Sequence, residues 1–207
     1  MKIYLSLCCA LFLVLSSQVY AKDPSFTYVE AQLISSGDID VSDGNLSVNV
    51  DLDGFSLNGS VQLGWVILQA SRFELDSDEL LGGSIEDSIT TVAAGLAFGG
   101  LPRTKFFALV RARRDELSLN SSFLEEEEDL VSAGIEAGVR FNVTDWLELN
   151  ANIGRPSVDV GDSFGLGAQL FVTEHLGITF NYNTIDAEED DINFSFDTTS
   201  IGVRYSF

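Results

Sequence analysis

From residue 22 onward the sequence alternates apolar and polar residues with a period of two, and almost no stretch has the period of a helix. In the clearest stretch, 130–141, one face carries Val131, Ala133, Ile135, Ala137, Val139 and Phe141, and the other carries Ser132, Gly134, Glu136, Gly138 and Arg140. Successive side chains of a β-strand point to opposite faces, so this pattern predicts strands with one apolar and one polar face. The sequence therefore predicts an all-β chain.

The alternation recurs along the chain and predicts about ten strands, with eight as the alternative. The segments are 25–35, 54–63, 66–75, 88–98, 105–114, 130–141, 146–154, 164–172, 176–184 and 199–207. Short connections alternate with longer ones, the longer being 36–53, 76–87, 115–128, 159–162 and 186–191. This order is typical of an up-and-down meander that has one plain rim and one rim of longer loops.

The length of these segments favours a membrane barrel over a soluble sandwich. Strands of globular proteins average about 5–6 residues, whereas a tilted membrane strand needs about 9–11. Open sheet edges do not persist in hydrocarbon, because each unpaired backbone group costs several kcal/mol. We therefore expect an up-and-down antiparallel transmembrane β-barrel with periplasmic termini. A secreted β-sandwich adhesin is the soluble alternative, because it also alternates apolar and polar residues.

The first 21 residues have the layout of a cleaved export signal. Lys2 precedes an apolar run over 3–15, and the small side chains of Val19 and Ala21 fit a cleavage site before Lys22. We expect residues 1–21 to be a signal peptide and residues 22–207 to form the barrel domain. Both cysteines, Cys8 and Cys9, lie in the signal, so the mature chain would contain no thiol.

Strand parity places seven charged residues on the polar face of the predicted barrel. An arginine that faces lipid at mid-depth costs about 2–4 kcal/mol, so these residues are expected to point into the lumen. The interior of a small barrel is barely wider than its side chains, which favours a packed ionic network over a narrow ion-conducting path. The residues are Glu30, Arg111, Arg113, Glu136, Arg140, Glu148 and Arg204.

Acidic residues gather in five regions on one predicted rim. The formal net charge is −21, which argues against nucleic-acid binding, since that requires clustered Lys and Arg. Of the 32 acidic residues, 26 lie in 36–53, 74–87, 115–129, 159–162 and 186–197, none of which contains Lys or Arg. A solvated acidic fringe on extracellular loops is the simpler interpretation. Weak Ca²⁺ or Mg²⁺ binding is the alternative, with Glu125, Glu126, Glu127, Glu128, Asp190 and Asp191 as candidates, although no EF-hand spacing is present.

No arrangement of residues in the sequence predicts an enzyme or a cofactor site. The single histidine, His175, lies in a short turn on the rim opposite the acidic regions, and no serine lies two residues from it. No phosphate-binding loop or dinucleotide fingerprint follows a strand and opens a helix. We therefore expect no catalytic residue and no cofactor.

The last residues of the chain are similar to those of a known protein family. With the signal peptide and the alternating strands, the terminal Arg204-Tyr205-Ser206-Phe207 resembles small outer-membrane β-barrel proteins, namely the OmpA-type transmembrane domain and OmpX-like barrels. The Asn142–Asp145 turn and the segment 53–60 are similar to short proteobacterial barrels. In that family alternate apolar residues ending in Phe are read by the barrel-assembly machinery; here these are Ile201, Val203, Tyr205 and Phe207.

The resemblance implies a protein of the Gram-negative outer membrane that contacts outer-membrane lipid and lipopolysaccharide. We expect a structural or cell-surface interaction role, with a packed lumen and acidic extracellular loops. The extracellular partner is not identified by the sequence. A narrow passive pore for ions or small solutes is the alternative function.

Overall fold

A computed structural model describes residues 23–43, 46–77, 83–121, 124–155, 161–189 and 192–207. These residues form ten strands: β1 (Tyr28–Asp43), β2 (Leu46–Leu63), β3 (Val66–Ser77), β4 (Gly83–Leu101), β5 (Thr104–Ser121), β6 (Leu124–Asn142), β7 (Leu147–Arg155), β8 (Asp162–Phe171), β9 (Leu176–Glu189) and β10 (Ile192–Ser206). Within the described ranges, no helix is long and apolar enough to cross a membrane. The expected signal peptide, residues 1–21, lies outside the described residues.

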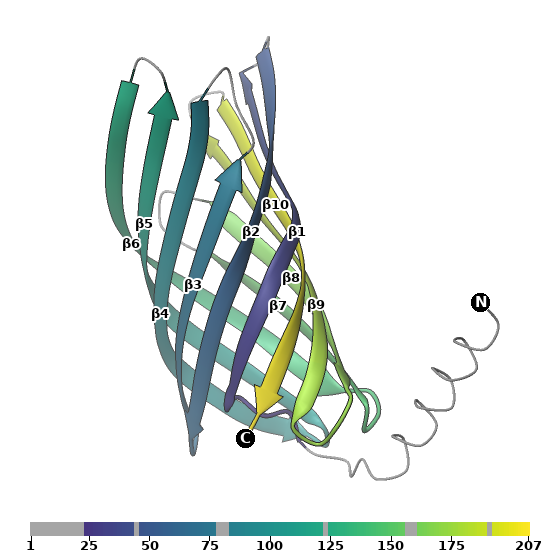
Figure 1. The fold of residues 1–207 in the computed structure, drawn as a ribbon. Helices are drawn as coiled ribbons and strands as arrows, with labels where there is room; N and C mark the ends of the chain where they lie inside the picture. The colour runs from purple at the N-terminus through teal and green to yellow at the C-terminus, as the bar shows by residue number, and fades with distance from the viewer. Residues whose placement is uncertain (1–22, 44–45, 78–82, 122–123, 156–160, 190–191) are drawn as a thin grey trace, which may run out of the picture.

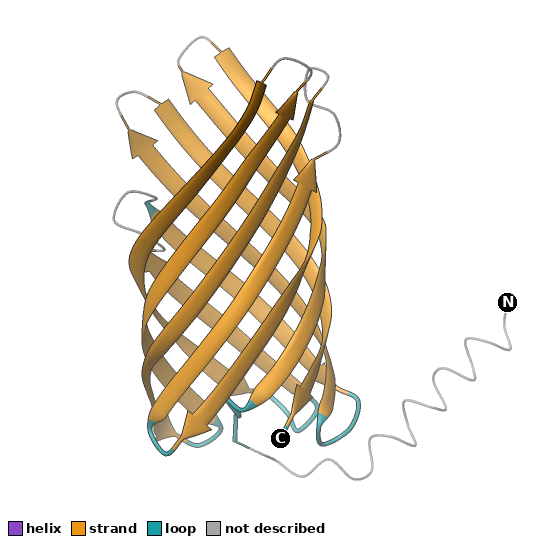
Figure 2. Cartoon of the chain, turned by 60° about the vertical axis from the view of Figure 1, so that its left-hand side comes forward, coloured by secondary structure: helices purple, strands orange, loops and turns teal. Residues whose placement is uncertain are grey.

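The ten strands form one closed ring, in which every strand pairs antiparallel with its neighbours in sequence and β1 pairs with β10 (Figure 2). The closing pair runs from Tyr28 opposite Ser206 to Asp43 opposite Ile192, with one register shift between Ile34 and Ser36. β1 begins and β10 ends at the same end of the barrel, which we call the lower end (Figure 1). The up-and-down barrel of ten strands is thus confirmed, and the alternatives of eight strands and of a sandwich are wrong.

The long acidic connections expected from the sequence are mostly strand. β5 continues to Ser121 and β6 begins at Leu124, so the expected loop 115–128 is largely a hairpin of two paired strands. The same holds for 36–53, where β1 reaches Asp43 and β2 begins at Leu46. The alternation of apolar and polar residues stops before each of these strands ends. The reason is that the part of a strand above the lipid meets water on both faces and needs no apolar side. The expected acidic loops are therefore acidic strand extensions.

Large apolar side chains cover the outside of the barrel in a broad belt. Leu33, Val92, Phe98, Val110 and Ile135 are each more than half exposed, and their neighbours in sequence face the lumen. Trp65 and Trp146 stand at short turns of the lower end, with exposed fractions of 79% and 50%. A closed barrel that presents apolar side chains outward and polar ones inward is arranged for a hydrocarbon surrounding, with aromatic residues at its border.

The strands differ in length, and this makes the upper rim uneven. β4, β5 and β6 have 19, 18 and 19 residues, whereas β7 and β8 have nine and ten. Pairing between β6 and β7 ends at Ile135 opposite Arg155, although β6 extends back to Leu124. The wall of the barrel is therefore lower at the β7–β8 hairpin than at β4–β6 (Figures 1 and 2).

Candidate functional site

The lower part of the lumen is closed by two buried ion pairs. Glu30 on β1 binds Arg204 on β10, with Oε2 at 2.7 Å from Nη2 and 3.0 Å from Nε. Glu148 on β7 binds Arg140 on β6, with Oε1 at 2.7 Å from Nε. No side chain of the four is more than 8% exposed. Arg204 lies 4.0 Å from Glu148 as well, so the two pairs form one lower ionic cluster.

Neutral side chains complete the hydrogen bonding of this lower ionic cluster. Thr179 donates to Glu30 Oε1 at 2.5 Å, and Gln32 donates to the same atom at 2.8 Å. Arg204 Nη1 donates to Gln169 Oε1 at 3.0 Å. Because buried charges are tolerated only when paired and hydrogen-bonded, these contacts explain how four ions occupy a narrow interior.

The segment that precedes β1 folds into the lower opening and acts as a cork, formed by residues 23–27. Pro24 and Phe26 are fully buried. The Phe26 ring packs edge-on against Phe107 at 5.5 Å, and the guanidinium of Arg140 lies 4.8 Å from the Phe26 ring centre. Arg140 Nη1 also donates to the carbonyl oxygen of Ser25 at 2.5 Å. The sequence analysis missed the cork, because it placed residues 25–27 in the first strand and gave residues 23 and 24 no role.

The three other charged residues expected in the lumen lie higher, on β5 and β6. Arg111 forms an ion pair with Glu136, which is almost fully buried. Arg113 pairs instead with Asp115, with Nε and Oδ1 2.6 Å apart. The structure thus places all seven expected residues inside the barrel, but in separate groups, and adds Asp115, which the sequence analysis assigned to an acidic loop.

Between these groups the lumen contains a chamber of about 280 Å³. Its wall includes the apolar side chains of Phe73, Ile89, Phe107 and Phe196, and it is amide-rich where β7 and β9 face it. The lumen is therefore not filled throughout, in contrast to the packed interior expected from the sequence. The inward apolar residues of β3–β5 were missed because these strands are apolar on both faces, and alternation then carries no signal.

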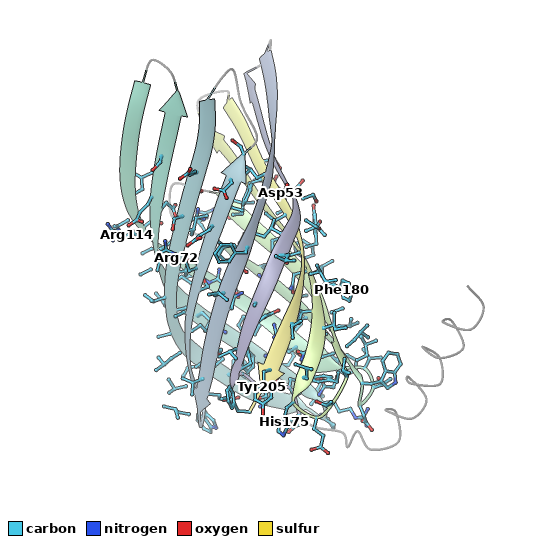
Figure 3. All side chains as sticks on the ribbon, viewed as in Figure 1. Asp53, Arg72, Arg114, His175, Phe180 and Tyr205 are labelled. Atoms are coloured by element: carbon cyan, nitrogen blue, oxygen red, sulfur yellow. The ribbon has the colours of Figure 1, made fainter. Side chains whose placement is uncertain are left out.

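The remaining residues singled out from the sequence lie on the two rims. His175 is exposed at the lower end, where a ring nitrogen lies 2.8 Å from the carbonyl oxygen of Ser206 and the ring stacks on Tyr205 (Figure 3). Ile201, Val203 and Tyr205 face outward on β10, and the Phe207 N–H donates to Thr27 O at 3.0 Å.

The side chains of the candidate metal ligands lie outside those that the structure describes. Glu125–Glu128 lie on β6, and Asp190 and Asp191 lie outside the described residues. Within the described ranges, no group of three or more His, Cys, Asp or Glu side chains is close enough to hold a metal ion.

Together, the closed ring, the apolar belt and the polar lumen define a transmembrane β-barrel of the type found in bacterial outer membranes. Solved structures share this fold. The translocator domain of the autotransporter NalP from Neisseria meningitidis aligns over 100% of this chain and 95% of its own, with a TM-score of 0.55 and 12% identity. The outer membrane protease OmpT from Escherichia coli aligns over 91% of this chain and 100% of its own, with a TM-score of 0.52 and 10% identity.

Neisserial surface protein A is also similar, with a TM-score of 0.46, 15% identity and coverage of 88% of this chain and 98% of its own. No family model and no curated protein matches the sequence. At these identities the comparisons establish the barrel fold and nothing about activity.

Removing one partner of the lower ionic cluster should destabilise the barrel strongly. Arg204→Met leaves Glu30 buried and unpaired, which should lower the free energy of unfolding by about 3–5 kcal/mol. Adding Glu30→Met should restore part of that loss. Urea unfolding in detergent micelles measures both, with Arg72→Met as the control, since Arg72 and Glu74 form an exposed pair worth less than about 1 kcal/mol. Equal effects of Arg204→Met and Arg72→Met would contradict the assignment.

A pH dependence follows from Asp87, which lies on β4 above the apolar belt. Burial raises the pKa of Asp87 from 3.8 to about 6, and the charge of Asp115 acts in the same direction against Arg113. A raised carboxyl pKa means that the folded state binds more protons than the unfolded state, so stability falls as pH rises from about 4 to 6. Asp87→Asn should remove this fall and be more stable at pH 7 by about 1 kcal/mol, after allowance for water screening. Unfolding midpoints of both proteins at pH 4 and pH 7 measure it; parallel midpoints at both pH values would contradict it.

Proposed function

We propose that this protein is an outer-membrane barrel of a Gram-negative bacterium that acts at the cell surface through its acidic upper rim. Its role is structural or interactive, and it carries no catalytic centre. The observation that supports this most directly is the polarity of the barrel along its axis. The lower end carries the short turns, the aromatic side chains, the start of β1 and the end of β10. The acidic strand extensions lie at the other end.

Three further features support the proposal. The outward belt is apolar and suits hydrocarbon, whereas the extensions above it are acidic and suit water. The C-terminal residues Val203, Tyr205 and Phe207 fit the signal that the barrel-assembly machinery reads. The predicted export signal at residues 1–21 fits a route through the inner membrane.

The acidic rim also favours a role for divalent cations. A surface with this much negative charge lies beside the phosphates of lipopolysaccharide, and Ca²⁺ or Mg²⁺ bridges between oxygen ligands relieve such repulsion. We propose weak and multiple cation contacts of this kind rather than one defined site. The protein partner of the rim, if it has one, would carry positive charge, because the rim repels anions.

A narrow pore is the second candidate, favoured by the chamber of about 280 Å³ in the lumen. The cork and the lower ionic cluster stand against it, because they fill the lower opening with buried side chains. Permeation would require these groups to move.

Orientation is testable with single cysteines, because the expected mature chain has none. Asp53→Cys places a thiol on the exposed outer part of β2 (Figure 3). Glu174→Cys places one in the exposed turn that precedes β9 at the lower end. A maleimide that cannot cross membranes should label Asp53→Cys on intact cells and label Glu174→Cys only after lysis. Boiled and unboiled gel samples control for folding. Labelling of Glu174→Cys alone on intact cells would reverse the orientation, and recovery of the protein in the soluble fraction would refute the membrane location.

Planar bilayers separate the closed barrel from the pore. We expect the intact protein to give no steady conductance, and Phe26→Ala to give small channels because it removes the ring that fills the lower opening. Phe98→Ala, which removes an outward ring of the belt, is the matched control and should stay silent. Steady conductance of the unaltered protein would favour the pore.

A further inference from the structure

Four asparagines converge on one wall of the chamber. Asn150 and Asn152 lie on β7, and Asn181 and Asn183 lie on β9. Between them runs β8, where Gly165 and Gly167 face the lumen. A Cβ at Gly165 would collide with the amides of Asn152 and Asn183, and a Cβ at Gly167 would lie 2.5 Å from Asn150 Nδ2 and collide with Asn181. The two glycines thus leave room for four amides to lie side by side.

These amides, which we call the asparagine wall, have unused hydrogen-bonding capacity. Among the described residues, none of the four side chains has a hydrogen-bond partner, and Asn181 Nδ2 is buried without one. Each amide offers two donor hydrogens and an acceptor oxygen. Buried polar groups are normally satisfied. Asn181 Nδ2 is the one buried atom without a partner among these four amides, and the half-buried rest is open to the chamber, so the contents of the chamber supply the partners of the asparagine wall.

The charges around the chamber are already neutralised. Arg111 pairs with Glu136, Arg113 with Asp115, and the lower ionic cluster pairs its own charges. Each of these lining charges thus has an opposite charge beside it, although Arg111 Nε keeps a donor hydrogen without a partner, and an ion would have to compete with these pairs. What faces the chamber instead is the four amides together with the rings of Phe73, Phe107 and Phe196, of which Phe73 on β3 lies across the ring from β8. This combination suits an uncharged molecule that has hydroxyl groups at its edge and C–H groups on its faces.

Size and access are consistent with a small ring. A chamber of about 280 Å³ lies just below the range of about 300–1,000 Å³ that is typical of small-molecule sites, which suits a small ligand. The chamber borders β7 and β8, the two shortest strands. Among the described residues these two strands end lowest, at Arg155 and Asp162, and Asn152 lies three residues before Arg155. The asparagine wall therefore lies near this part of the rim.

From this geometry we propose that the chamber is a binding site for a neutral monosaccharide, whose hydroxyl groups bond to the asparagine wall while a C–H face packs on Phe73, which lies across the ring on β3. The site is independent of the cell-surface role, because it lies within the lumen and uses none of the acidic extensions. It also does not require conduction, since the lower ionic cluster closes the chamber from below.

The test titrates the folded barrel with glucose, galactose and mannose, followed by saturation-transfer NMR. The detergent is an amine oxide, because maltoside and glucoside detergents have sugar headgroups that would compete with the hexose. Binding of at least one hexose should saturate, with a dissociation constant on the order of 1 mM. Glucuronate, which adds a carboxylate, should bind at least about tenfold more weakly than the hexose, because the arginines are occupied.

Two variants remove the site in different ways. Asn150→Leu with Asn181→Leu keeps the side-chain volume and removes two amides, and Gly167→Ala puts a methyl group among them; each should weaken binding at least about tenfold. Gly99→Ala is the matched control, because Gly99 does not line the chamber and a Cβ there meets only the carbonyl oxygen of Thr104, at 3.7 Å; it should bind as the unaltered protein does. Heat-modifiability on gels confirms that each variant is folded.

Three results would overturn the proposal. The first is that the binding signal of no hexose saturates at concentrations up to about 100 mM. This would mean that the amides are satisfied by water alone. The second is a folded Asn150→Leu/Asn181→Leu protein that binds as tightly as the unaltered one. The third is equal or tighter binding of glucuronate, which would show that the paired charges do not select against anions. None of these outcomes bears on the cysteine labelling, so the proposed surface role and the chamber site stand or fall separately.

Discussion

Every backbone hydrogen bond in the spanning part of this chain must be made within the protein, and closure between β1 and β10 is what satisfies that requirement. Without the pairing from Tyr28 with Ser206 to Asp43 with Ile192, two rows of amides and carbonyls would face hydrocarbon. A ring of ten strands then fixes the size of the interior. The placement of charge, the cork and the chamber all follow from the need to fill or hydrate that interior.

The interior meets this need in three different ways along the barrel axis. At the lower end four ions pair inside a space where they are shielded from water, and the cork covers them with Phe26. In the middle the wall is half apolar and half amide, and a chamber remains. Ile34, Leu52, Leu75 and Ile89 form an apolar cluster, of which Leu75 and Ile89 also line the chamber. Paired ions, amides and apolar side chains thus occupy different parts of one lumen.

The sequence predicted those parts of the fold that alternation controls. The strand count, the meander and the inward position of residues such as Arg111 and Glu136 follow from period two together with the penalty for charge in lipid. The strand ends were predicted poorly, since water on both sides of the extensions removes the need for alternation. The inward apolar residues Ile67 and Leu109 could not be separated from the lipid-facing ones by hydropathy. The cork depends on tertiary packing that no local pattern records.

For the candidate site, the sequence identified the ionic residues but not their partners. Glu30 and Arg204 lie 174 positions apart, and only the closure of the ring brings them into contact. Asn150 and Asn181 appeared as ordinary polar positions of two strands. What makes them notable is the pair of glycines on β8, whose effect depends on the register of three strands. Register across strands is set by the closed sheet as a whole, so such a wall is visible only in three dimensions.

The uneven strand lengths have a consequence for the behaviour of the protein in suspension. Above Ile135, β6 has no described strand beside it on the β7 side, so it exposes a stretch of sheet edge to water. Exposed edges are templates for aggregation between molecules, because a second chain can add to them as a further strand. The residues 125–128 on that edge are four consecutive glutamates. Two copies brought edge to edge would repel each other there, so the acidic rim also protects the barrel from self-association.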